Sequence, residues 1–207
     1  MSSTRHHAVD RASERDREAD PGWWTSFGYY GVWQVFGFGL PFIWLAFQSP
    51  TRATLLGPAV IVGLYAAALA IAAGRQGYHV GASWPRLSRR KLGTGVGYRR
   101  FLRRFCVVAA AVSLATFGGV LAGRVGGEFV AAGVAFAVAV GVLAFVPVLA
   151  RDSTRARVAR AGVYLAGLAV AAIVARPFDP ATAITSAPLA FGAVAVASCY
   201  DLSVPIR

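Results

Sequence analysis

The sequence predicts an all-α, polytopic membrane protein in which six transmembrane helices form three hairpins, with both termini in the cytoplasm (N-in/C-in). Three observations favour this fold class: the composition, the length of the apolar runs and the placement of the basic residues. Hydrophobic residues make up 57% of the 207 residues and charged residues 14%, against about 45–50% and about 25% in a soluble domain. This composition excludes an ordinary water-soluble globule.

Six apolar runs are long enough to cross a bilayer as helices. A hydrocarbon core of about 30 Å requires about 20 apolar residues in a helix, which also satisfies the backbone hydrogen bonds. None of the runs contains Asp, Glu, Lys, Arg or His, and they predict a transmembrane domain over 23–200. The fifth run is the shortest, and Arg160 and Arg176 at its ends extend its reach by snorkelling. The six runs are 23–48, 54–73, 105–123, 129–150, 161–175 and 183–200.

The basic residues predict the orientation of these helices. Of the 21 Lys and Arg residues, 18 lie in alternate segments of the chain, and only Arg52, Arg124 and Arg176 lie in the others. Under the positive-inside rule this alternation predicts a multi-pass protein of the cell membrane with cytoplasmic termini. The net charge of +12 is then an orientation signal, and no nucleic-acid partner is expected. The segments predicted to be cytoplasmic are a disordered tail 1–22, the loops 74–104 and 151–160, and the tail 201–207.

The cytoplasmic loop 74–104 carries the densest positive charge. In its last part the Arg pairs recur four residues apart, with Tyr98, Phe101 and Phe105 on another helical face, which predicts an amphipathic helix in the anionic headgroup layer. We expect the loop to contact anionic lipid, with a membrane or cytoplasmic protein partner as the alternative. The residues predicted to make this contact are Arg89, Arg90, Lys91, Arg99, Arg100, Arg103 and Arg104.

Small residues on the third run predict how the helices pack. Because lipid offers little hydrophobic drive for helices to associate, small side chains four residues apart mark faces where backbones approach closely. Ala111, Ala115, Gly119 and Gly123 form the longest such ridge. The third run is therefore predicted to be a central packing helix.

The first run contains the main candidate for a site within the membrane. It holds 11 of the 25 aromatic residues, most of which we assign to the membrane interfaces and to lipid contact. Gln34 lies near mid-depth, where a polar side chain needs a partner; Ser186 and Ser198 of the sixth run are further candidates. A packing hydrogen bond is favoured over ligand recognition. The candidate ligand or packing site comprises Trp33, Gln34, Phe38, Ser113 and Thr116.

The sequence offers no grouped catalytic chemistry. No catalytic, cofactor-binding or metal-ligating set emerges, so we expect no cofactor and no enzymatic activity. Asp152, Asp201, His79 and Cys199 fall near the same face, although nothing in their spacing requires a site. The favoured function is a non-catalytic membrane component, a subunit or scaffold. The alternative is a small transporter or solute-binding permease subunit with a mid-membrane site near Gln34.

The three arginines outside the cytoplasmic segments admit two interpretations. Arg52, Arg124 and Arg176 occupy separate short connections. Together they would collect an anion at the mouth of the bundle. Singly, each would pair with lipid phosphate or with a neighbouring acid, and this second interpretation is the favoured one.

Overall fold

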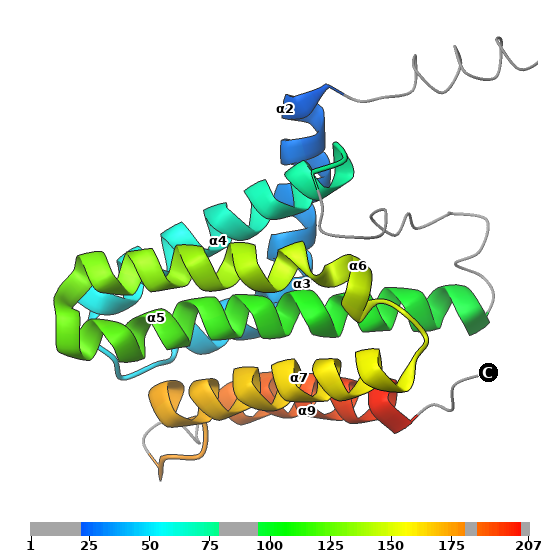
Figure 1. Cartoon of the computed structure of the whole chain (residues 1–207). Helices are drawn as coiled ribbons and strands as arrows, with labels where there is room; N and C mark the ends of the chain where they lie inside the picture. Colours follow the sequence, from blue (N-terminus) through cyan, green and yellow to red (C-terminus); the bar gives the residue numbers. More distant parts are fainter. Residues whose placement is uncertain (1–21, 79–94, 181–185, 204–207) are drawn as a thin grey trace, which may run out of the picture.

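The described part of the chain is a bundle of helices. The structure is a computed structural model that describes residues 22–78, 95–180 and 186–203, and no strand occurs among them (Figure 1). The predicted all-α class is therefore confirmed. The helices are α2 (Trp23–Thr25), the π-helix η1 (Ser26–Val32), α3 (Trp33–Phe47), α4 (Ala53–Arg75), α5 (Gly95–Ala144), α6 (Val146–Leu149), α7 (Thr154–Ala175) and α9 (Ala187–Ser203).

Four helices in the described residues are long and apolar enough to cross a membrane. They are Trp23–Phe47, Ala53–Arg75, Gly97–Ala144 and Thr154–Ala175, and α9 is a shorter apolar helix. Four apolar helices of this length indicate a membrane protein. The count of six crossings and the orientation of the termini stay predictions.

The longest helix, α5, contains the predicted third run and most of the fourth. Its helical geometry is broken at Gly127, where φ is 80° and ψ is −172°. Glycine occupies this region of positive φ without the steric cost that a side chain would add. The chain reverses at this point, so that a first arm (95–126) and a second arm (128–144) lie side by side (Figure 1).

Several helix boundaries differ from the apolar runs. The second arm ends at Ala144, and Val146–Leu149 form the separate short helix α6. Helix α7 begins seven residues before its apolar run, because the Ser153 side chain accepts a hydrogen bond from the backbone N–H of Ala156 at 3.2 Å and caps the helix. Helix α9 continues to Ser203. Backbone hydrogen bonding thus extends both helices past their apolar segments and into charged sequence.

The first arm of α5 forms the centre of the bundle, as predicted. Helix α5 contacts α3, α4, α7 and α9. In its most apolar stretch of 18 residues, 72% of the residues are buried, against 33–39% in the corresponding stretches of the other three long helices. Ala111 and Ala115 are fully buried. A Cβ atom at Gly119 would lie 2.6 Å from the carbonyl oxygen of Ala131, and one at Gly123 would lie 2.7 Å from the Ala131 Cβ. The small-residue ridge therefore faces protein.

We expect Gly119→Ala to destabilise the fold and Gly118→Ala to leave it intact. A methyl group at position 119 would press on the backbone of the second arm, whereas nothing lies within 4 Å of a Cβ at position 118. Overpacking of this kind typically costs about 1–3 kcal/mol. The free energy of unfolding in mixed micelles measures the difference. Equal stability of the two variants would contradict the close approach of the two arms.

Candidate functional site

Four charged side chains from four separate segments meet at one end of the bundle. This charged end comprises Arg103 of α5, Asp152 before α7, Arg160 of α7 and Asp201 of α9, joined by Tyr164. Figure 1 shows the start of α7, α6 and the end of α9 at the same end of the bundle. Arg103 and Asp201, which are 98 residues apart in the chain, are therefore brought together.

Asp201 is the centre of this cluster. Its Oδ1 lies 3.3 Å from Arg103 Nε, and its Oδ2 lies 3.1 Å from Arg160 Nε. The Tyr164 hydroxyl donates a hydrogen bond to the same Oδ2 at 3.0 Å. Asp152 completes the cluster from the side, with its Oδ1 2.7 Å from Arg103 Nη2.

The two arginines also bind backbone carbonyls where the chain leaves α6. Arg103 Nη1 donates to the carbonyl of Ala150 at 2.8 Å, and Arg160 Nη1 donates to the carbonyls of Leu149 and Arg151. Carbonyls at a helix C-terminus have no partner within the helix. The guanidinium groups supply those partners, and they hold the turn between α6 and α7 against α5.

Burial decides how strongly each member of the cluster matters. The side chains of Arg160 and Asp201 are 2% and 4% exposed, whereas the Asp152 side chain is 59% exposed. Buried charges are tolerated when they are paired and hydrogen-bonded, and the two arginines and two aspartates balance in charge. The hydrogen bond from Arg103 holds the pKa of Asp152 below its usual value.

Both carboxylate oxygens of Asp201 contact donors. Arg103 Nε and the Tyr164 hydroxyl donate hydrogen bonds to Oδ1 and Oδ2, and Arg160 Nε forms an ion pair with Oδ2. The ion pairs and hydrogen bonds of the cluster join α5, α7 and α9. The cluster offers no activated nucleophile among its own members.

Sequence reasoning misses this cluster. It places Asp152 and Asp201 at the same face without a reason for a site, and it assigns Arg160 to snorkelling. The signal in the sequence is the coincidence of isolated acids and arginines at one predicted end of several apolar helices, where burial would force them to pair. Of the other two residues named with the aspartates, Cys199 is exposed, and His79 lies outside the described residues.

The basic residues predicted to contact lipid separate into three groups. Arg89, Arg90 and Lys91 lie outside the described residues. Arg99 is half-buried and Arg100 is exposed at the start of α5. Arg103 and Arg104 turn into the protein, where Arg104 is 5% exposed. Arg103 pairs with Asp152 and Asp201 in the protein, and the contact of the basic residues with lipid stays a prediction.

The members of the candidate mid-membrane site have different surroundings in the structure. Trp33 is 70% exposed, and Phe38 packs edge-on against Phe101 and Phe105 of α5. The Ser113 hydroxyl donates to the Gly167 carbonyl of α7 at 2.6 Å. Phe38 and Ser113 thus contact different helices, and Trp33 lies on the outside of the described bundle.

Gln34 itself is half-buried. Its Oε1 is inaccessible and accepts no hydrogen bond from the described residues. Thr116 is buried and lies beside Gly63 of α4. Ser186, another of the expected partners, accepts a hydrogen bond from Trp44 Nε1 at 2.6 Å. Sequence reasoning locates the polar group and does not identify its surroundings.

Comparison with known proteins does not assign a family. No protein-family model matches the chain, no curated protein is significantly similar to it, and no solved structure matches its fold.

We expect Asp201→Asn to destabilise the protein far more than Asp152→Asn. The first change leaves two buried guanidinium groups without their shared carboxylate, which typically costs about 3–5 kcal/mol. The second removes the pair between Arg103 and the Asp152 side chain, which is 59% exposed, and a pair open to water on one side is worth about 0–1 kcal/mol. Unfolding in mixed micelles compares the two isosteric variants. A destabilisation of equal size in both would contradict the central role of Asp201.

Proposed function

We propose that the protein is a non-catalytic, multi-pass component of the cell membrane, a subunit or scaffold. Six segments cross the bilayer in this proposal: Trp23–Phe47, α4, the two arms of α5, α7 and α9. The reversal at Gly127 supports counting the arms separately. The distribution of basic residues supports cytoplasmic termini, with the charged end facing the cytoplasm.

The exposed apolar surface is the observation that carries this proposal. Large apolar side chains point outward from every long helix, and continuous apolar surface of this kind marks contact with lipid or with another membrane protein. Examples on successive helices are Trp33 (70%), Ile61 (70%), Phe129 (85%), Leu165 (67%) and Leu189 (76%).

The start of α5 supports a contact with anionic lipid or with an acidic partner. Arg100 is exposed and Arg99 half-buried, and Tyr98 and Phe101 beside them are 57% and 36% exposed. Guanidinium groups bind phosphate, and neighbouring aromatic rings suit the membrane interface. The loop 74–104 would then anchor the cytoplasmic face.

Replacing both Arg99 and Arg100 by Gln should reduce the retention of anionic lipid. Native mass spectrometry of the full chain, released from nanodiscs of phosphatidylglycerol and phosphatidylcholine, counts the bound lipids. Each arginine near an anionic surface contributes about 1 kcal/mol of attraction, so the double variant should bind phosphatidylglycerol about tenfold or more weakly.

The double variant Arg151→Gln/Arg155→Gln is a matched control, because both side chains are exposed near the same end. An equal decrease of bound lipid in the two double variants would contradict a specific contact at the start of α5. If a protein co-purifies with the wild type and is absent only from the Arg99/Arg100 variant, the start of α5 contacts a protein partner and not only lipid.

A small transporter or solute-binding permease subunit is the second candidate. The observation that favours it is the inaccessible Gln34 Oε1, which has no donor among the described residues, because a buried polar atom without a partner is costly. A bound solute would supply that hydrogen bond.

We expect Gln34→Leu to leave stability unchanged or to raise it, since the change breaks no hydrogen bond to Oε1. Gln76→Leu is the contrasting change. It removes the bond that Gln76 Nε2 donates to Ser26 Oγ at 3.0 Å, which is worth about 1 kcal/mol. Thermal unfolding compares the variants. If Gln34→Leu released a solute found with the wild type while stability was preserved, the transporter function would be supported; strong destabilisation by Gln34→Leu would contradict it and favour packing.

A further inference from the structure

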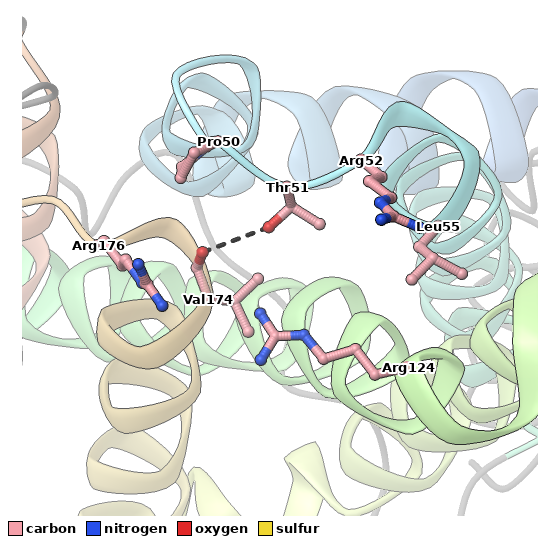
Figure 2. A pocket seen from close by; sticks show the side chains of 7 residues that line it. All are labelled: Pro50, Thr51, Arg52, Leu55, Arg124, Val174 and Arg176. Atoms are coloured by element: carbon pink, nitrogen blue, oxygen red, sulfur yellow. Dashed lines mark hydrogen bonds between the residues drawn. The ribbon is translucent and has the colours of Figure 1, made fainter.

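Three arginines converge on a recess at the end of the bundle opposite the charged end. Arg52 lies between α3 and α4, Arg124 beside the turn in α5, and Arg176 directly after α7. The cavity has a volume of about 360 Å³. This arginine pocket is lined by Pro50, Thr51, Arg52, Leu55, Arg124, Val174 and Arg176 (Figure 2).

The backbone positions of these residues are held by the fold. The Arg52 carbonyl accepts hydrogen bonds from the N–H groups of Leu55 and Leu56, both at 3.1 Å, where α4 begins. The Thr51 hydroxyl donates to the Val174 carbonyl at 3.3 Å and ties this connection to the end of α7 (Figure 2). The pocket is therefore built on anchored chain rather than on a free loop.

The backbone of Arg176 adopts a conformation that is unfavourable for a residue with a side chain. It ends α7 in the left-handed conformation, with φ 47° and ψ 57°, and its N–H donates to the Ala172 carbonyl at 3.2 Å. Glycine is the usual residue in this position because it has no Cβ. An arginine here is strained, and strain of this kind clusters at ligand sites.

The lining has the chemistry of an oxyanion site. Figure 2 shows the three arginine side chains around the pocket, with Val174 between Arg176 and Arg124, and no carboxylate is among the lining residues. Glu128 and Asp179, acids of neighbouring connections, do not line the pocket. The planar guanidinium fork matches the paired oxygens of a phosphate group.

The walls limit what enters. Pro50, Leu55 and Val174 supply the apolar part of the lining. The volume falls in the range of about 300–1,000 Å³ that is usual for small-ligand sites. The pocket therefore accommodates a phosphate group with a small substituent.

We propose that the arginine pocket binds a phosphate group, presented either by free phosphate or by a phospholipid headgroup. Both sources offer the same tetrahedral oxyanion to the same three guanidinium groups. The site is independent of the lipid contact proposed at Arg99 and Arg100, which belongs to the other end of the bundle. Either proposal can fail without the other.

Titration of the purified full chain in a non-ionic detergent tests this site. The probes are inorganic phosphate and a short-chain phosphatidylglycerol, with sodium chloride at the same ionic strength as the reference. The shift of the unfolding midpoint with probe concentration yields the dissociation constant. Arg124→Gln and Arg52→Gln each remove one guanidinium group from an exposed position, and Arg155→Gln removes an exposed guanidinium from the opposite end.

We expect Arg124→Gln and Arg52→Gln each to weaken binding about tenfold or more, and Arg155→Gln to leave it unchanged. Stabilisation by inorganic phosphate identifies free phosphate as sufficient. Stabilisation by the phospholipid alone identifies a headgroup as the source. No stabilisation of the wild type by either probe, or equal weakening in all three variants, would overturn the proposal.

Discussion

Close approach of helix backbones around α5 is the constraint on which the rest of the structure depends. In lipid, apolar side chains gain little by leaving one apolar surface for another, so association rests on close packing. Gly119 and Gly123 allow the two arms of α5 to meet at Ala131, and Gly63 brings α4 against Ala115 and Ala135. The central helix can therefore contact α3, α4, α7 and α9 at once.

The ion-pair cluster follows from that packing. Once α5, α7 and α9 are close, Asp201 lies within reach of Arg103 and Arg160, and their burial makes pairing obligatory. The cluster adds directional polar contacts among three helices whose other contacts are largely apolar. The arginine pocket at the opposite end differs from this cluster in its charge. Three arginines line it, and no carboxylate is among the lining residues.

The sequence predicts correctly those features that depend on the order of residues along a single helix. The apolar runs locate every long helix of the described chain, and the spacing of Ala111, Ala115, Gly119 and Gly123 identifies the packing face, because a helix repeats its face every three to four residues. The sequence does not show that Arg103 and Arg104 turn into the protein. Helical periodicity groups residues on a face, but it does not state whether a neighbouring helix or lipid covers that face.

The membrane class, the central position of the third apolar run and the turn near residue 127 were determined by the sequence alone, since hydropathy, small-residue spacing and glycine are local properties. The partners of Asp201, the surroundings of Gln34 Oε1 and the meeting of Arg52, Arg124 and Arg176 were decided by the tertiary structure. Each of these depends on contacts between segments that are distant in the chain. Their geometry exists only after the helices have packed.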